Sequence, residues 1–331
     1  TAEFKKAFNA VQTLISEGRI RAGHDVGSGG LITTLLEMCF ADNELGAQID
    51  LTALGEDDLL KVLFAENVGV VLQGDSSIAA YLDAQGVRYT KIGAPTEGEN
   101  LTLTHQGQTY TFNIAECRDV WFLTSYLLDK QQTANDKATE RYQNYSEQPL
   151  QYSFPAHFTG EKPVRPQGKR PVAAVIREKG SNSEREMANA LYLAGFDVKD
   201  VHTTDLTSGR ETLEDVQFIG TVGGFSNSDV LGSAKGWAGA LLYNEKAKKA
   251  LDNFFARPDT LSVGICNGCQ LFMELELINP EHSEHGKMRH NDSHKHETGF
   301  VSVTIPENNS VMLSTLAGST LGVWISHGEG K

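Results

Sequence analysis

The chain has 331 residues, of which 40% are hydrophobic and 22% are charged, and its formal net charge is −14. No apolar run approaches the roughly twenty residues of a membrane span, and the acidic balance argues against nucleic acid or an anionic membrane as a main partner. The length indicates more than one domain. The four cysteines show no spacing typical of disulfide pairing, so we expect a reducing, cytoplasmic setting.

The first part of the chain predicts an α+β domain. Apolar residues recur at helical spacing from Phe4 to Ile15, and Gly18 ends that pattern. Further expected elements are helices at 31–40 and 59–64, a strand at 69–73, and a hairpin that joins 101–104 to 109–114. We place this domain at residues 1–118, a usual size for one domain.

A glycine-rich turn, Gly-His-Asp-Val-Gly-Ser-Gly-Gly at residues 23–30, leads into the first of these later helices. Free amides at a helix N-terminus bind phosphate, and an acidic side chain beside them can hold Mg²⁺. The pattern is compatible with a nucleotide-phosphate site and equally with an ordinary strand-to-helix turn.

Residues 119–168 predict a helical and coil linker. A helix that contains Trp121 gives way to the polar run 131–148 and then to coil interrupted by prolines.

Residues 169–331 alternate strand and helix. Expected strands at 172–176, 197–201, 218–222 and 261–264 are interleaved with expected helices at 183–193, 235–255 and 269–277. Such alternation predicts a parallel, doubly wound sheet, whose active site lies outside the carboxyl ends of the strands.

Residues 264–270 read Gly-Ile-Cys-Asn-Gly-Cys-Gln directly after an expected strand, a pattern typical of a nucleophile elbow. Gly264 and Gly268 permit a tight turn, so Cys266 would stand exposed beside a helix N-terminus that favours its thiolate. The amide of Asn267 is then placed to help bind an oxyanion. The motif predicts acyl transfer through a thioester.

A base and an orienting carboxylate follow near the end of the chain. His327 can serve as the base, and Glu329, two residues on, projects from the same side of an extended segment. Consecutive glycines at Gly223 and Gly224 follow an apolar run and allow a loop whose amides face a reacting carbonyl.

Two other classes remain open. One is a Cys/His hydrolase or peptidase on the same elbow fold. The other is a zinc or redox module that uses Cys266 and Cys269 with nearby histidines. The candidate histidines are His282, His285, His290, His294 and His296.

Four ordered segments resemble the phosphoribosylformylglycinamidine synthase family: residues 177–187, 222–238, 264–270 and 326–330. The resemblance implies a flavodoxin-like class I glutamine amidotransferase domain, preceded by an α+β domain like the C-terminal half of an aminoimidazole-ribonucleotide-synthetase-like domain. It implies the following roles: Cys266 as nucleophile, His327 and Glu329 completing the triad, Gly224 and Asn267 amides as the oxyanion hole, and Cys269 as structural.

The turn at residues 23–30 resembles the His-Asp-x-Ser-Asp-Gly-Gly motif of the family's ATP-binding half. This implies Asp25 as a magnesium ligand and the backbone of Gly27, Ser28 and Gly29 as nucleotide-binding, although Gly27 replaces Ser and Ser28 replaces Asp. The stretch around Asn291 resembles the family's Asn-x-Ser-x-x-Phe-Glu-Ala-Arg-Phe, with His296 in place of its Phe and Gly299 in place of its Arg.

The resemblance implies glutamine-dependent conversion of formylglycinamide ribonucleotide to formylglycinamidine ribonucleotide in purine biosynthesis, with ATP and Mg²⁺ used by the full-length enzyme. The glutaminase half-reaction would require no cofactor, and its substrates would be glutamine and water. We further expect the chain to correspond to the enzyme's C-terminal portion, opening within the second synthetase half and stopping before the last strands of the glutaminase domain.

Overall fold

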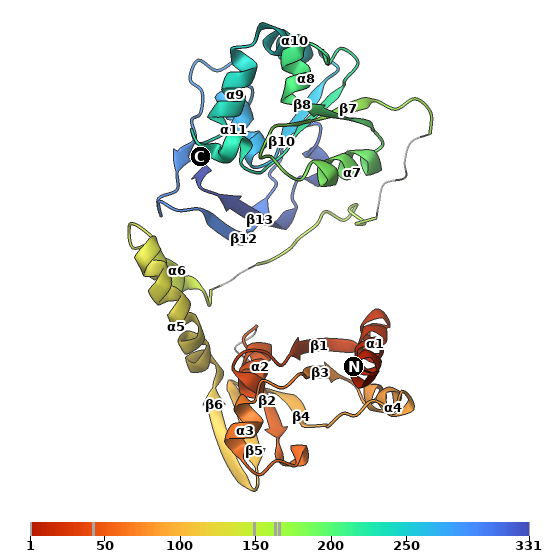
Figure 1. Ribbon diagram of the computed structural model, residues 1–331, viewed down its shortest axis with the longest axis vertical. Helices are drawn as coiled ribbons and strands as arrows, with labels where there is room; N and C mark the ends of the chain where they lie inside the picture. The colour runs from red at the N-terminus through yellow and green to blue at the C-terminus, as the bar shows by residue number, and fades with distance from the viewer. Residues whose placement is uncertain (1, 42–43, 148–149, 162–163, 165–166, 331) are drawn as a thin grey trace. The chain divides into compact units, whose positions relative to one another are not determined.

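The computed structural model describes residues 2–41, 44–147, 150–161, 164 and 167–330. The chain divides into two compact units, Thr1–Gln131 and Gln132–Lys331 (Figure 1). No helix of the described residues is both long and apolar enough to cross a membrane.

The first unit combines helices with two separate groups of strands. Its helices are α1 (Ala2–Ser16), α2 (Gly30–Cys39), α3 (Leu59–Phe64), α4 (Ser77–Ala84) and α5 (Ile114–Gln132), whose last residue already belongs to the second unit. Its strands are β1 (Ile20–Asp25), β2 (Leu45–Asp50), β3 (Val70–Gly74), β4 (Gly93–Glu97), β5 (Asn100–His105) and β6 (Gln108–Asn113). Strand β1 pairs antiparallel with β3, and the others form a sheet in the order β4-β2-β5-β6, with β2 and β5 parallel.

The predicted helices, the predicted strand and the hairpin of the first unit are all present. The sequence reasoning missed β1, β2, β4 and α4. In β4 every residue is exposed, so this strand has no apolar alternation by which it could be recognised.

The second unit is built around a parallel sheet. Its helices are α6 (Lys137–Asn144), α7 (Glu184–Ala194), α8 (Thr203–Ser208), α9 (Lys235–Leu242), α10 (Glu245–Phe255) and α11 (Asn267–Glu274). Strands β7 (Val172–Arg177), β8 (Asp197–His202), β9 (Phe218–Thr221) and β10 (Leu261–Gly264) lie in the order β8-β7-β9-β10, all parallel. This second-first-third-fourth order is the flavodoxin-like arrangement.

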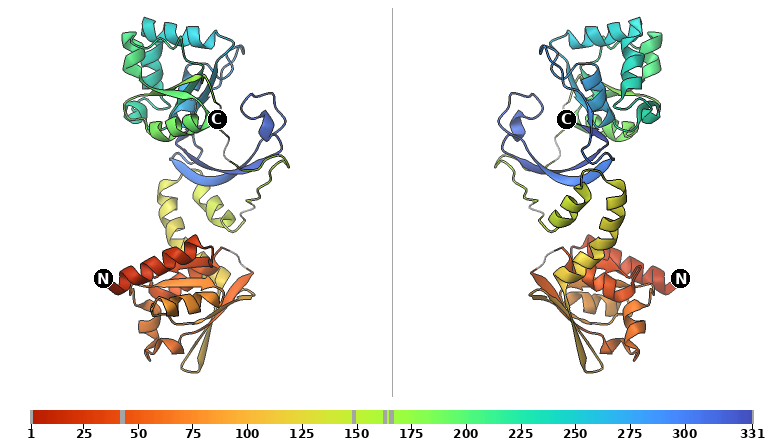
Figure 2. Two further views of the ribbon diagram at one scale, coloured as in Figure 1. Left: turned by 90° about the vertical axis from the view of Figure 1, so that its right-hand side faces the viewer. Right: turned by 90° about the vertical axis from the view of Figure 1, so that its left-hand side faces the viewer.

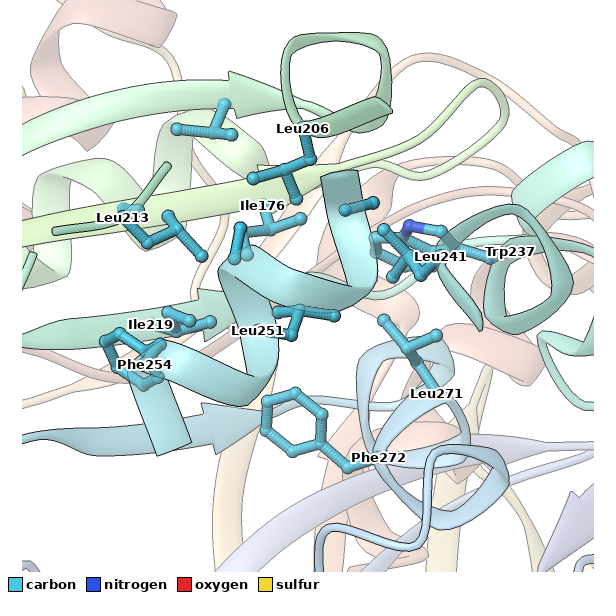
Figure 3. Close-up of a cluster of buried hydrophobic side chains, with 14 of the residues drawn as sticks. Ile176, Leu206, Leu213, Ile219, Trp237, Leu241, Leu251, Phe254, Leu271 and Phe272 are labelled. Carbon is cyan, nitrogen blue, oxygen red and sulfur yellow. The ribbon is translucent and has the colours of Figure 1, made fainter. Parts of the chain in front are cut away.

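Both faces of this sheet are covered, as a doubly wound fold requires. On β7, Ala173 and Val175 pack with Leu191 of α7, while the alternate residues Ala174 and Ile176 face a second, larger core. That larger core contains the following buried residues (Figure 3): Leu206, Leu213, Ile219, Trp237, Leu241, Leu251, Phe254, Leu271 and Phe272.

One predicted element of this unit was wrong. The single helix expected at 235–255 is two helices, α9 and α10, because Asn244 has extended backbone angles and its side chain accepts bonds from the Lys246 and Ala247 amides. Asn244 therefore caps a new helix rather than continuing the old one.

Beyond the parallel sheet, the chain forms the short strands β11 (Arg289–His290) and β14 (Glu329–Gly330) and the long antiparallel pair β12 (Glu297–Thr304) and β13 (Thr320–His327). Figure 2 shows this long pair as a curved ribbon in two opposite views. Short 3₁₀ turns lie at Thr52–Leu54, Ser226–Asp229 and Ser314–Leu316.

Candidate active site

The candidate site lies where the loops after β7, β9 and β10 meet. The loop after β7 and the loop after β9 form an isolated antiparallel bridge between Ser181 and Gly224. The strands β7 and β9 are neighbours, and their following helices α7 and α9 pack into the two different cores. This is a topological switch point, the usual place for a ligand in an open α/β sheet.

The sharp turn predicted at Cys266 is present. Cys266 is exposed, its backbone has φ 53° and ψ −113°, and α11 begins at the next residue. A Cβ on Gly264 would lie 2.6 Å from the Gly268 carbonyl oxygen, and one on Gly268 would overlap the Thr221 carbonyl oxygen. Only glycine at both positions lets β9, β10 and α11 approach closely enough to hold the cysteine in this strained conformation.

The backbone of Gly224 faces away from the loop that it pairs with. In the bridge, Asn182 N donates to Gly223 O and Phe225 N donates to Gly180 O, both at 2.9 Å. Because these flanking groups make the bonds, the N–H of Gly224 itself points away from the loop that contains Ser181. Its φ of +106° suits glycine, and a Cβ there would lie 2.8 Å from Asn182 N.

The glycine loop lies close to the nucleophile. A Cβ on Gly223 would lie 3.1 Å from the Cys266 Cβ and 3.7 Å from its Sγ. The loop is fastened to the elbow by Asn267, whose buried side chain accepts a bond from Ser226 N at 3.1 Å through Oδ1. The sequence reasoning considered only the backbone of Asn267 and missed this role of its side chain.

The end of β13 lies over the thiol. Cys266 Sγ donates to the Ser326 carbonyl oxygen at 3.6 Å, one residue before His327. The Nδ1 of His327 and the Oε2 of Glu329 are buried, and neither has a hydrogen-bond partner among the described residues. The structure therefore brings the three predicted residues into one region without pairing them as a hydrogen-bonded triad.

Three further residues contact the segment 327–329, a role that the sequence reasoning gave to none of them. Asn291 donates from Nδ2 to His327 O at 2.7 Å and from its amide to Gly328 O at 3.0 Å. Gln270 donates to Glu329 O at 3.2 Å, and His290 Nδ1 lies 3.1 Å from Glu329 Oε1. Gln270 and Asn291 stand within the motifs quoted above, which was the available signal for them.

The zinc site considered above would need a cluster of ligands. In the described ranges, no group of three or more His, Cys, Asp and Glu side chains is arranged to hold a metal ion. Three of the candidate histidines have other contacts: His285 lies 3.6 Å from Glu276, His290 lies 3.1 Å from Glu329, and His296 bonds Ser326 Oγ at 2.9 Å.

The cysteines differ in environment, and this difference predicts a labelling order. Burial, and then the charge of Cys266, raises the pKa of the Cys269 thiol above its ordinary 9.0, and burial raises the pKa of Cys39 and of Cys117 as well. At a pH of about 7.5 these three thiols stay protonated, and they are buried or partly buried. Cys266 is instead exposed to a reagent in solution.

We therefore expect iodoacetamide to alkylate Cys266 first, with Cys269 reacting only as the pH rises past 9.0. A peptide-mapped time course at several pH values measures this order. Equal rates for Cys266 and Cys269 at neutral pH would contradict it.

In the glycine-rich turn of the first unit, one backbone amide donates a hydrogen bond to a carboxylate of the same unit. The Gly29 amide donates to Glu66 Oε1 at 2.9 Å, so a carboxylate takes the place that a phosphate would occupy. The Asp25 side chain is 87% exposed, and its nearest described ionic partner is His24, at 3.7 Å.

Comparison with known proteins places both units. Residues 170–331 match the CobB/CobQ-like glutamine amidotransferase domain, and residues 2–106 match the C-terminal domain of AIR synthase related proteins. The chain is 39% identical over 341 residues to the probable phosphoribosylformylglycinamidine synthase, chloroplastic/mitochondrial, of Arabidopsis thaliana, covering 99% of this chain and 24% of that protein. It is 38% identical over 350 residues to the Homo sapiens phosphoribosylformylglycinamidine synthase, covering 98% of this chain and 26% of that protein.

The chain thus spans about a quarter of the length of these curated relatives. Among solved structures, PurLQS from Thermotoga maritima is similar with a TM-score of 0.40 and 28% identity, covering 49% of this chain and 69% of that one.

Proposed function

Because the chain belongs to the phosphoribosylformylglycinamidine synthase family, we propose that its second unit hydrolyses glutamine to glutamate and ammonia at Cys266. The observation that carries this proposal is the strained elbow. Cys266 stands exposed at φ 53°, close to the Gly223 loop, and its Sγ lies 3.6 Å from the Ser326 carbonyl oxygen at the end of β13.

In the first step Cys266 gives its thiol proton to His327, and the resulting thiolate attacks the side-chain amide carbon of glutamine. The carbonyl oxygen becomes an oxyanion, and the amides of Gly224 and Asn267 are proposed to bind it. The Gly224 N–H points out of its bridge, and Asn267 opens α11, where a first-turn amide has no acceptor within the helix. The Asn267 side chain accepts a hydrogen bond from the amide of Ser226, two residues after Gly224, and so fixes the loop of one donor to the helix of the other.

In the second step His327 protonates the nitrogen of the tetrahedral intermediate, the C–N bond breaks to release ammonia, and a glutamyl thioester stays on Cys266. Water then attacks the thioester carbonyl, with His327 accepting its proton, and glutamate is released. We assign Glu329 to orient the His327 ring and to stabilise its charged form.

The unpartnered atoms of His327 and Glu329 support this pairing. A buried polar atom without a hydrogen bond costs about 1–3 kcal/mol. One of the two atoms is a ring nitrogen, which can donate, and the other is a carboxylate oxygen, which can accept, so a hydrogen bond between them would satisfy both. Catalytic hydrogen bonds are often formed only when substrate binds.

For the whole protein we propose the family's complete reaction, in which ammonia converts formylglycinamide ribonucleotide to formylglycinamidine ribonucleotide with ATP and Mg²⁺. The four cysteines, all free thiols, suit a reducing compartment such as the cytoplasm.

The glycine-rich turn of the first unit does not fit a phosphate and its metal ion in the observed conformation, because the Gly29 amide already donates to Glu66 and the Asp25 side chain points to solvent. The assignment of Asp25, Gly27, Ser28 and Gly29 stays a prediction.

Turnover of alternative amides tests the glutaminase proposal. We expect the chain to release glutamate and ammonia in equal amounts from glutamine, and to leave asparagine and unrelated peptides intact. Hydrolysis of peptides without a preference for glutamine would instead favour the Cys/His hydrolase or peptidase, and an absence of turnover with glutamine would overturn the proposal.

A further inference from the structure

The linker helix α6 contacts a loop of the candidate active site. This helix lies outside residues 170–331, the part that matches the glutamine amidotransferase domain. Ala134 N donates to Ser293 O at 2.9 Å, and Asn135 Nδ2 donates to Asp292 O at 2.7 Å. From α6, Arg141 Nη2 lies 2.8 Å and 2.7 Å from the two carboxylate oxygens of Glu297.

These contacts end next to the proposed base. Glu297 is the direct cross-strand partner of His327 in the β12–β13 pair. The loop that Ala134 and Asn135 hold begins at Asn291, which bonds the carbonyls of His327 and Gly328. Two separate routes therefore connect the linker to the backbone that carries His327.

The contact between α6 and the loop is polar. A cavity of about 320 Å³ lies between them, and all of its lining residues are polar or charged. The Glu297 side chain is 25% exposed and that of Arg141 is 46% exposed. Ion pairs this exposed add little to folding stability, so we expect this one to matter for geometry rather than for the free energy of unfolding.

We propose that Arg141 and Asn135 are positioning residues of the glutaminase: together they hold residues 291–297 and, through them, the backbone of His327. The proposal rests on the glutaminase function proposed above. Helix α5 ends at Gln132, two residues before Ala134, so the backbone that leaves the first unit enters this contact directly.

Replacing Arg141 tests the positioning role. A misplacement of about 1 Å can cost on the order of 10²-fold in rate, so we expect R141A to lower kcat for glutamine about 10- to 100-fold with KM nearly unchanged. The alkaline and acid limbs of the kcat pH profile should move as well, because His327 is the group displaced. Iodoacetamide should still alkylate Cys266 before the other cysteines, since the elbow itself is held by other contacts.

Two further variants separate this role from a general structural one. The charge-swapped pair R141E with E297R should recover most of the lost kcat. R170A is the matched control, because Arg170 forms a comparable exposed pair with Asp197 at 3.3 Å on β8, and we expect it to behave as wild type. An R141A variant that matches R170A in kcat and pH profile would overturn the proposal.

Hydrogen–deuterium exchange gives a readout that does not need turnover. With R141A we expect faster amide exchange in peptides covering 291–297 and 320–327, and unchanged exchange in β7 to β10. Unchanged exchange everywhere would overturn the positioning role even if the wild-type chain hydrolysed no glutamine. Conversely, faster exchange in a chain without glutaminase activity would support the contact while the proposed function fails.

Discussion

Replacing Cys266 with alanine should abolish glutamine hydrolysis, lowering kcat by at least roughly 10⁴-fold. The thioester cannot form without the sulfur, and the remaining oxyanion donors supply only a small part of the rate enhancement. Because Cys266 is exposed, its side chain contributes little to the core, and the smaller alanine side chain should leave the fold intact. Glutamate release by C266A against wild type measures the effect.

Cys269 provides the matched control. It lies three residues along the same motif, is partly buried, and has a thiol pKa raised by burial. We expect C269S to keep kcat within about threefold, because a group that remains a protonated thiol is not the nucleophile. Loss of activity in C269S with retention in C266A would reverse the assignment and revive the redox or metal alternative.

Replacing His327 with glutamine should have the second largest effect, lowering kcat by about 10²- to 10⁴-fold. The nitrogen of the tetrahedral intermediate is a poor leaving group until it is protonated and can leave as ammonia. His327 is the proposed proton donor at the end of β13, one residue beyond the Ser326 carbonyl that the thiol contacts. Substrate binding does not need this proton, so KM should change much less. The pH dependence of kcat should lose the limb that the histidine contributes.

His285 is the control histidine, since it lies in the same sequence region and contacts Glu276 rather than the candidate site. H285Q should retain the activity and pH profile of the wild-type chain. A H327Q variant with normal kcat would remove His327 from the mechanism and leave Glu329 without a role.

The elbow and the parallel sheet were predictable because their signals are local. Two glycines around Cys266 mark the tight turn, and short apolar runs alternating with helical patterns mark a doubly wound sheet. The break between α9 and α10 was also readable in principle, since Asn244 is a favoured N-cap residue followed by a helical pattern.

Contacts between distant residues were not predictable in this way. Arg141 and Glu297 are 156 positions apart, and nothing in the polar run around Arg141 distinguishes it from a solvated linker. The same holds for the Glu66 carboxylate that occupies the Gly29 amide, 37 positions away. Such pairs depend on how the chain folds back on itself, and one sequence carries no periodic signal for them.

Covalent labelling with a diazo-oxo-norleucine, a glutamine-shaped electrophile, tests the central claim most directly. Peptide mass spectrometry should find the label on Cys266 alone, and excess glutamine should prevent it, because both molecules would compete for the same nucleophile. Label on Cys269, or label on Cys266 that glutamine does not prevent, would contradict a glutamine-specific nucleophile at this elbow.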